Sequence, residues 1–312
     1  MKKISKIGTV LFLFSFFPIL CADSSSTNIE LEGEFLFWTT YQNDFSSATH
    51  STPVFTTTDF LSNRIDKPTY SWRPGYRLSG YCDVFFGEVG ARFTSYQGAL
   101  NERFTTPALN GFYPLFTLWN DQLPSDYTRF SSIYGNIDLW IIDAYAIFNL
   151  LSQDILIYPK IGVRNLWLNQ SYDVTYDGGT FAAGTDILYR SSKFYGVGPQ
   201  FGVTGFFPLF GNIFLTGEAL GTWYAGNFRD FQSETFLDRT LTNQKFTQTF
   251  SRFSIDLQAG MEWVGVFFDD RFLTAITVGG DWIYFNKGSN KLPFNGSSTF
   301  FTGGHAGIKI AF

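Results

Sequence analysis

The chain has 312 residues, a formal net charge of −5 and an aromatic content of 20%, with Phe alone supplying 38 residues. Only 16% of the residues are charged, against about 25% in an average protein, and the mean hydropathy is −0.01. This hydropathy excludes a bundle of membrane helices. The class that combines many aromatic residues, many glycines and near-neutral hydropathy is the membrane β-barrel, whose strands are half apolar and half polar.

Residues 1–22 are predicted to form a secretory signal peptide that is cleaved from the chain. Three lysines within the first six residues precede an apolar stretch at 7–20, which is shorter than the ~20 residues that a membrane-anchoring helix needs. A lipid anchor on Cys21 is disfavoured because no small residue comes just before it. We therefore expect residues 23–312 to form a single exported domain, whose net charge is −8 because cleavage removes three lysines and no acid.

Cleavage would leave Cys82 as the single cysteine of the domain. Two interpretations stay open for it. It is either a small residue at a strand end or a residue that forms an intermolecular disulfide in an oxidising compartment.

Segments of alternating apolar and polar residues, each roughly 10–15 residues long, follow one another along the mature chain and predict strands. The clearest, 253–263, places Phe253 and Ile255 on one face and Ser254 and Asp256 on the other. In a membrane barrel the apolar face contacts lipid and the polar face encloses the lumen. The ten segments run approximately over 29–41, 70–81, 84–96, 134–149, 155–168, 193–207, 212–226, 250–263, 271–285 and 299–312.

The connections between these segments alternate between short and long, which predicts short periplasmic turns and long extracellular loops. The segment 134–149 changes phase between Asp138 and Asp143, which predicts a β-bulge. The connection 97–133 either folds inward as a constriction or holds a further hairpin, which would give twelve strands instead of about ten. The long connections are 42–69, 97–133, 171–192, 227–249 and 286–298.

The fold class predicted from these observations is all-β: a transmembrane, antiparallel, up-and-down β-barrel. A closed barrel leaves no strand edge unpaired in lipid, where each unpaired backbone group costs several kcal/mol. Ile308, Ile310 and Phe312 share the apolar face of the last segment and are predicted to form the insertion signal that the barrel-assembly machinery reads. Aromatic residues near segment ends are expected in the girdles at the membrane surfaces: Trp38, Trp72, Trp263, Trp282 and Tyr284.

The polar faces of the segments supply the candidate functional residues, which are expected to line the lumen. They either face water, as in a pore, or pair across the lumen as a plug of salt bridges; a narrow barrel is filled by side chains and a wide one leaves a channel. His305 is expected to be a solvated residue of the lumen wall. The candidates are Glu30, Glu32, Glu34, Arg73, Arg77, Glu88, Arg92, Lys160, Arg164, Glu218, Arg252, Asp256, Glu262, Asp281 and Lys309.

Catalytic and cofactor chemistry is not indicated. The sequence has no Gly-x-Ser-x-Gly motif, no Cys-x-x-Cys pair and no basic run, and its two histidines lie far apart in the sequence. We expect no enzyme activity, no cofactor, no metal site and no nucleic-acid partner.

The stretch 194–206 (FYGVGPQFGVTGF), followed by 217–226 (GEALGTWYAG), resembles the central signature of the Legionella-type major outer membrane protein (MOMP-like) family. Shorter matches at 34–38, 72–77, 159–164 and 260–263 occur in the same order and spread over most of the mature chain. The resemblance implies a pore-forming barrel in the bacterial outer membrane and supplies no catalytic residues.

Two functions stay open. The first is a porin-like passive channel for small hydrophilic solutes or ions, with a weak cation preference because acids dominate the first segment. The second is a surface adhesin or structural envelope barrel without an open pore. Outer-membrane lipid, lipopolysaccharide and the barrel-assembly machinery are the expected partners, together with a possible second copy of the chain.

Overall fold

The structure, a computed structural model, describes residues 28–42, 48–51, 65–66, 70–105, 111–114, 130–148, 156–178, 181–236, 239–267, 272–286 and 298–312. The predicted signal peptide lies outside the described residues. All elements of the described part are strands, and none of it forms a helix that could cross a membrane.

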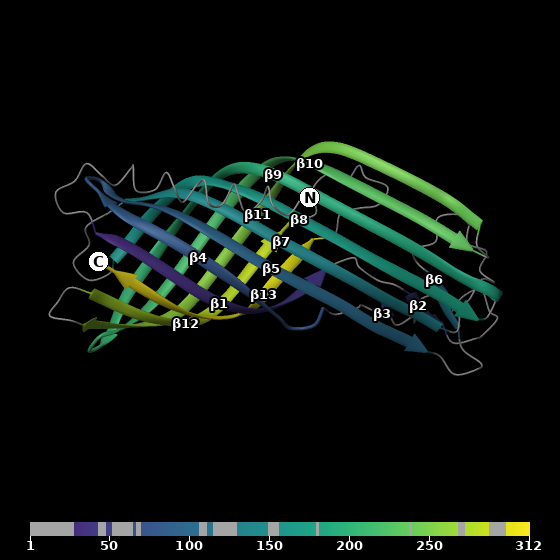
Figure 1. The fold of residues 1–312 in the computed structure, drawn as a ribbon, viewed down its shortest axis with the longest axis horizontal. Coiled ribbons are helices and arrows are strands. Elements are labelled where there is room, and N and C mark those ends of the chain that lie inside the picture. Colours follow the sequence, from purple (N-terminus) through teal and green to yellow (C-terminus); the bar gives the residue numbers. More distant parts are fainter. Residues whose placement is uncertain are drawn as a thin grey trace.

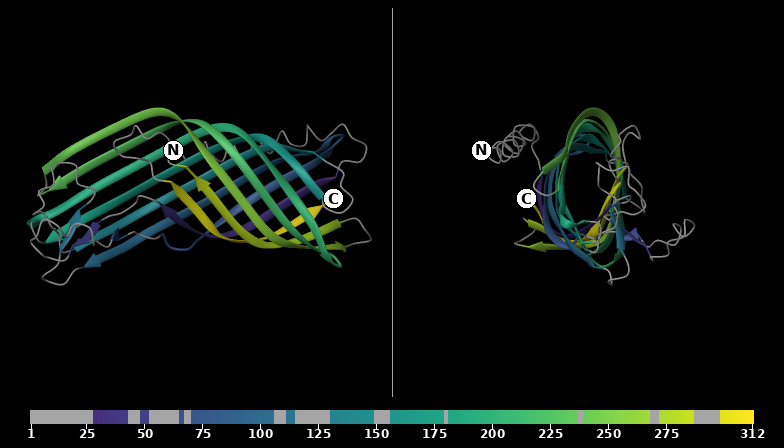
Figure 2. Two further views of the ribbon diagram at one scale, coloured as in Figure 1. Left: turned by 180° about the vertical axis from the view of Figure 1, so that it is seen from behind. Right: turned by 90° about the vertical axis from the view of Figure 1, so that its right-hand side faces the viewer.

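Ten of the strands form one closed antiparallel barrel, which confirms the predicted fold class (Figures 1 and 2). Each of the ten alternating segments falls on one barrel strand, so the twelve-stranded alternative is wrong. Their order around the barrel is β1-β13-β12-β11-β10-β9-β8-β7-β5-β4, and β4 pairs with β1. The strands are β1 (Ile29–Gln42), β4 (Arg73–Val84), β5 (Gly87–Thr105), β7 (Phe130–Phe148), β8 (Leu156–Gly178), β9 (Phe181–Phe210), β10 (Ile213–Phe236), β11 (Arg239–Phe267), β12 (Phe272–Phe285) and β13 (Thr299–Ala311).

One end of the barrel carries tight connections, and we call it the turn end. The β4–β5 connection is the pair Phe85–Phe86, and the β9–β10 connection is the pair Gly211–Asn212. Gly211 has a φ of 54°, a left-handed conformation that glycine adopts without steric cost and that two-residue hairpin turns require. The chain end at Phe312 lies at the same end, because Phe312 and Ile29 exchange backbone hydrogen bonds of 3.0 and 3.1 Å.

At the opposite end, which we call the wall end, the strands on one side extend farther along the barrel axis than those on the other side (Figure 1). β9 and β11 have 30 and 29 residues, whereas β4 has 12 and β1 has 14. The segments 171–192 and 227–249, which the sequence predicts as long loops, are therefore largely strand. They continue the antiparallel pairing of the barrel, for example Tyr172 with Arg190, with register shifts at Tyr176/Gly178 and at Glu234/Thr235. We call this raised part of β5 and β7–β11 the wall.

Three short strands lie outside the barrel. β2 (Ala48–Ser51) pairs with both β3 (Ile65–Asp66) and β6 (Gly111–Pro114), so the three form a small sheet of their own. β6 belongs to the connection for which the sequence left open a further barrel hairpin, and it takes no part in the barrel.

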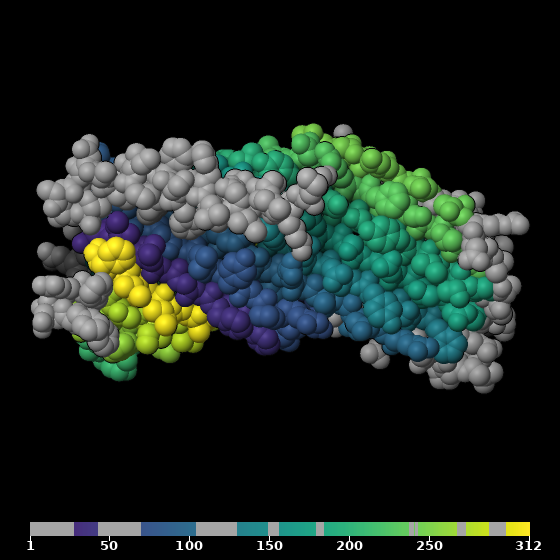
Figure 3. All heavy atoms as spheres, in the orientation of Figure 1, coloured from purple at the N-terminus to yellow at the C-terminus, as the bar shows by residue number. Residues whose placement is uncertain are grey.

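The outer face of the barrel is apolar, as the alternation predicts. Phe201 on β9 and Phe35 on β1 are both 57% exposed, and side chains of neighbouring strands form a continuous surface on the face seen in Figure 3. Such a face is stable against lipid and costly in water. Ile308, Ile310 and Phe312, for which an insertion signal is predicted, belong to this face, where all three are exposed.

The apolar face ends below the wall in a row of aromatic residues. Trp167 lies against Tyr195 with ring centroids 5.2 Å apart, and Trp223 lies against Phe253 at 6.3 Å. Two residues farther along β9, Lys193 is exposed on the same outer face. This change from aromatic to charged residues marks the boundary expected at a membrane surface, so the wall rises outside the apolar zone.

The structure corrects the predicted bulge in β7. The strand pairs with β5 and β8 without a register shift, and its odd-numbered residues face inward throughout. The apparent change of phase arises because the inward residues are apolar at Leu139 and Ile141 but charged at Asp143. The backbone of β7 is regular, and the inward side chains change from apolar to charged along the barrel axis.

Cys82 is buried and disulfide-bonded. The expectation of a single cysteine concerns the mature domain after cleavage, and it stays a prediction. The sequence has one other cysteine, Cys21, which lies outside the described residues.

Candidate functional site

The barrel interior is the candidate site, and it is divided into three zones along the axis. From the turn end these are an open vestibule, a belt of ion pairs and a core of apolar side chains. Inward-facing residues of the ten barrel strands build all three, because every second residue of a strand faces inward.

The apolar zone, which we call the lumen core, fills the interior toward the wall end. Trp38 of β1, Tyr96 of β5 and Phe301 of β13 pack on one another with ring centroids 5.6 to 6.3 Å apart. Further inward residues complete the same buried cluster, among them Leu36, Leu139, Leu166, Phe194, Tyr224 and Phe285.

Trp38 does not lie in a girdle at the membrane surface, as the sequence predicted. It is completely buried inside the barrel, and its indole Nε1–H donates to Asp281 over 2.9 Å. The alternation of the strand predicts this position, because Trp38 lies four residues after Glu34 and therefore on the same, inward face of β1.

The ion-pair belt lies next to the lumen core and consists of ten residues that are connected by short polar contacts. Each of its cations contacts at least one carboxylate. The members are Glu34, Arg77, Arg92, Asp143, Lys160, Arg164, Glu218, Asp256, Asp281 and His305.

The first cluster of the belt is centred on Arg164 of β8, which is 2% exposed. Its Nε and Nη2 donate to the two oxygens of Asp143 over 2.6 and 2.9 Å. Its Nη1 donates to Asp256 of β11. Because β9 and β10 separate β8 from β11, the Arg164–Asp256 contact spans the interior.

The second cluster joins β4 to β12 and β13. Arg77 donates to Glu34 over 2.7 Å and to Asp281 over 3.4 Å. His305 Nδ1 lies 3.0 Å from Asp281, and His305 Nε2 lies 3.7 Å from Glu34. His305 faces the lumen, as predicted, but it is part of this ion-paired cluster and not a solvated wall residue.

The third cluster borders the vestibule. Arg92 of β5 contacts both oxygens of Glu218 of β10, and Lys160 Nζ lies 2.7 Å from the same carboxylate. Lys160 Nζ also lies 3.5 Å from the ring centroid of Tyr145, a cation–π contact. One carboxylate therefore holds two cations.

Glycines make room for Tyr145 beside this cluster. A Cβ at Gly90 would lie 2.6 Å from the Tyr145 ring, and a Cβ at Gly162 would lie 2.7 Å from Tyr145 Cβ and would collide with the Ala144 carbonyl oxygen. Both positions are therefore too close to their neighbours for any larger residue. The same explanation fits Gly198 and Gly202 of the 194–206 motif, whose Cβ atoms would collide with β10.

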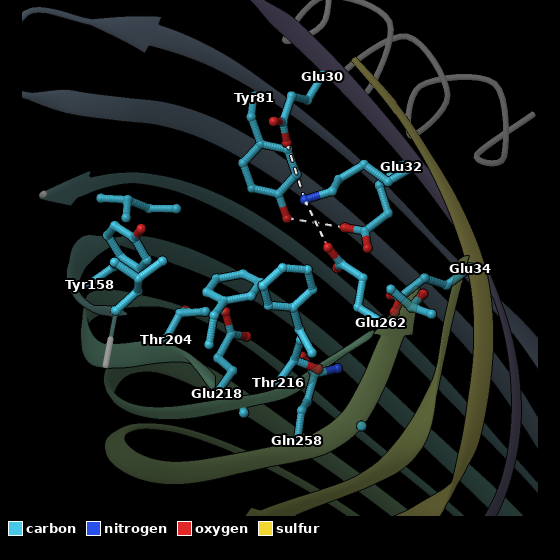
Figure 4. Close-up of a pocket in the computed structure, with 18 of the residues that line it drawn as sticks. Glu30, Glu32, Glu34, Tyr81, Tyr158, Thr204, Thr216, Glu218, Gln258 and Glu262 are labelled. Carbon is cyan, nitrogen blue, oxygen red and sulfur yellow. Dashed lines mark hydrogen bonds and ion pairs between the residues drawn. The ribbon is translucent and has the colours of Figure 1, made fainter. Parts of the chain in front are cut away.

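The vestibule is a cavity of about 340 Å³ at the turn end, with an acidic lining (Figure 4). Lys309 lies between Glu30 and Glu262, with its Nζ at 3.4 and 3.9 Å from their oxygens. Tyr81 donates to Glu32 over 3.1 Å. Toward the belt the cavity borders Arg92, Glu218 and their neighbours, and a pocket within the belt holds about 10 Å³, about the volume that one water molecule needs.

The structure places the fifteen candidate lumen residues in different zones. Glu34, Arg77, Arg92, Lys160, Arg164, Glu218, Asp256 and Asp281 belong to the belt. Arg252 is buried in the lumen core, 5.3 Å from the centroid of Phe285, and Arg73 is exposed at the start of β4. The vestibule holds Glu30, Glu32, Glu88, Glu262 and Lys309.

Two belt residues were not among the sequence candidates. The sequence pattern places Asp143 at a bulge and His305 among the solvated residues of the lumen wall. Counting alternate residues from Leu139 would have placed Asp143 inward, but no pattern in the sequence shows that Arg164 and Asp256 meet it.

The wall carries a separate group of inward charges outside the apolar zone. Arg190 and Asp230 form a buried pair with Nη2 2.9 Å from Oδ2. Asp186 and Glu234 are completely buried. Burial raises the pKa of the Asp186 carboxyl to about 6, so this carboxyl holds its proton in mildly acidic solution.

Searches among known proteins match neither a family model nor a curated protein. The chain is similar to a solved major outer membrane protein from Thermus thermophilus, at 14% identity and a TM-score of 0.35, over 92% of this chain and 100% of that one. It is also similar to a Pseudomonas aeruginosa FadL homologue, at 8% identity and a TM-score of 0.25, over 95% and 92% of the two chains. A third is the transport unit of the autotransporter AIDA-I from Escherichia coli, at 12% identity and a TM-score of 0.27, over 92% and 90%.

Proposed function

We propose that the protein is an outer-membrane barrel whose lumen is closed at rest and which holds the wall at the cell surface as a structural or adhesive element. The observation that carries the proposal is the ion-pair belt, in which Arg77, Arg92 and Arg164 each reach a carboxylate on a strand that is not their neighbour. These contacts cross the interior of the barrel and would obstruct a continuous water path.

The lumen core supports the same conclusion independently. Its aromatic rings fill the interior beyond the belt, and opening the lumen would require both the ion pairs and this packing to be displaced. Buried charges that lose their partners cost several kcal/mol, and each large aromatic residue removed from its packing costs about 3–5 kcal/mol.

The apolar outer face supports a membrane location, and short turns at one end with a tall wall at the other support the orientation typical of the bacterial outer membrane. In this orientation the turn end and the vestibule face the periplasm. Lipid, lipopolysaccharide and the barrel-assembly machinery stay the proposed partners, and neither catalysis nor a cofactor is part of the proposal. Membership of the Legionella-type family stays a prediction.

A porin-like passive channel also stays a prediction, and planar-bilayer recording separates the two functions. The refolded wild-type protein is expected to insert without stable conductance steps, in bilayers where a porin of known conductance gives them. Removal of one whole belt cluster together with part of the lumen core, in the variant Asp143→Ala/Arg164→Ala/Asp256→Ala/Trp38→Ala/Tyr96→Ala, is expected to give open events. Stable steps from the wild-type protein would overturn the closed barrel in favour of the channel.

A further inference from the structure

The vestibule carries more negative than positive charge. Its basic residues are Arg92, Lys160 and Lys309. Because Glu34 is paired with Arg77 of the belt, two of the other carboxylates are in excess when His305 is neutral. In a cavity with low-dielectric walls such an excess attracts cations more strongly than it would on an open surface. The six glutamates that line the cavity are Glu30, Glu32, Glu34, Glu88, Glu218 and Glu262.

The cations of the vestibule do not balance this charge locally. Arg92 and Lys160 both bind Glu218, and Lys309 is shared between two glutamates at distances above 3 Å. Glu32 accepts a hydrogen bond from Tyr81 and forms no salt bridge with a cation of the described strands. The side of the cavity formed by β1 and β11 is therefore short of positive charge.

A second observation at the same place indicates a hydrogen-bonding ligand. Thr277 of β12 lines the cavity and is nine-tenths buried, yet its Oγ1 has no hydrogen-bond partner among the residues that the structure describes. Gly307 packs closely against this hydroxyl, since a Cβ there would lie 2.8 Å from Thr277 Oγ1 and 2.7 Å from Glu34 Cγ. A buried hydroxyl without a partner is costly, and a donor entering the cavity would supply that partner.

The arrangement fits an organic cation and not a metal ion. The described residues contain no group of three or more His, Cys, Asp or Glu that could hold a metal, and Lys309 lies between Glu30 and Glu262. Apolar side chains share the lining with the glutamates, among them Ile147, Leu156, Phe206, Phe214 and Leu273. The volume of about 340 Å³ lies at the lower end of the range, about 300–1,000 Å³, of small-molecule sites.

We propose that the vestibule binds a linear polyamine. Its ammonium groups pair with Glu32 and Glu262, one of them donates to Thr277 Oγ1, and its methylene groups contact the apolar lining. The proposal goes beyond the closed-barrel function and does not depend on whether the lumen conducts.

Isothermal titration calorimetry of the refolded full chain in detergent micelles, with spermidine as the probe, tests this site. Saturable 1:1 binding is expected, and Glu32→Gln and Glu262→Gln are each expected to weaken it by at least about threefold. Thr277→Val keeps the shape of the side chain and is expected to weaken binding by about twofold. Glu102→Gln, at the wall end of β5, is the matched control and should bind like the wild type.

Magnesium ions at the same concentration and an uncharged diol of similar length are expected to leave the spermidine affinity unchanged. The proposal is overturned by absence of saturable binding, by equal affinity in all four variants, or by displacement of spermidine by magnesium at equal concentration. The heat-dependent electrophoretic shift of a folded barrel verifies each variant. Thr277→Val keeps the test decisive if either glutamine variant does not fold.

Discussion

Arg92 of β5 and Glu218 of β10 meet in the interior of the barrel, with Nη1 2.5 Å from Oε1 and Nη2 3.3 Å from Oε2. The strands β7, β8 and β9 separate them around the barrel. The contact therefore connects strands on opposite sides of the barrel and not adjacent strands. Two-point contacts of this kind between an arginine and a carboxylate are directional and strong, so we expect the belt to hold the cross-section of the barrel.

Removal of the central arginine of the first cluster is expected to destabilise the barrel severely. In Arg164→Met the carboxylates of Asp143 and Asp256 stay buried near each other without their cation. Loss of one partner of a buried pair costs about 3–5 kcal/mol, and urea unfolding in lipid vesicles measures it.

The control is Lys193→Met, which removes an exposed cation from the outer face of β9 and should change stability by less than about 0.5 kcal/mol. Equal stability of Arg164→Met and the wild type would show that the belt contributes nothing to the fold.

Gly162→Ala is expected to destabilise the barrel by about 1–3 kcal/mol. The added methyl group would collide with the Ala144 carbonyl oxygen, so backbone on the neighbouring strand must move. Gly205→Ala is the matched control, because its Cβ would lie 3.8 Å from the nearest atom, the Leu156 carbonyl oxygen. Unfolding midpoints in urea compare the two, and a larger loss at Gly205 would contradict the packing described for Tyr145.

A charge introduced on the outer face tests where the membrane lies. Phe201→Arg, within the apolar zone of β9, is expected to cost about 2–4 kcal/mol in lipid vesicles, and Thr247→Arg on the outer face of β11 about 0–1 kcal/mol. Both positions are exposed, so the difference reports the surroundings of the side chain. If the two variants were equally stable in vesicles, the apolar zone would not be the membrane-spanning part.

The wall is expected to become less stable as the pH rises. The folded wall holds the Asp186 proton up to about pH 6, whereas the unfolded chain releases it near the ordinary value of 3.8. Between these values the folded state binds more protons than the unfolded state, so stability falls across this window and stays low above it. The shift corresponds to about 1–3 kcal/mol.

Asp186→Asn removes this pH dependence, because it places an uncharged amide of similar shape beside Glu234. Hydrogen exchange of the β8–β9 hairpin, corrected for the intrinsic effect of pH, should show stronger protection than in the wild type at pH 7.5 and similar protection at pH 4. Equal protection of the two proteins at pH 7.5 would disprove the assignment.

Strand positions and the lipid-facing surface could be predicted from the sequence because both depend on local alternation. Phe201 and Ile308 face outward because their places in the alternating pattern of their strands put them on the apolar face. The lengths of strands β8 to β11 could not be predicted in the same way. The polar composition of 171–192 and 227–249 resembles that of loops, and only the pairing of each strand with its neighbours turns it into a wall.

The interior was harder to predict because its chemistry depends on contacts between distant strands. A rule that the lumen face is polar fails at Ile141 and Phe301, which face inward and are buried in the lumen core. It holds at Asp143 and Arg164, whose partners come from other strands. Parity shows which residues face the interior, but the choice between a water-filled lumen and a packed one depends on the circumference of the barrel and on the volumes of all ten inward faces together.

The pairing of β1 with β13 also bears on how the molecule forms. Glu30 lies opposite Ala311 and Gln42 lies opposite Thr299, so this ladder joins the two most distant parts of the described chain. Its closure pays the full entropy of the intervening loop, and contacts of such long range slow folding. The hairpins can assemble one after another from either side, but the cylinder is complete only when its final strand arrives, and until then both β1 and the last-formed hairpin expose an unsatisfied edge that a chaperone or a second chain could capture.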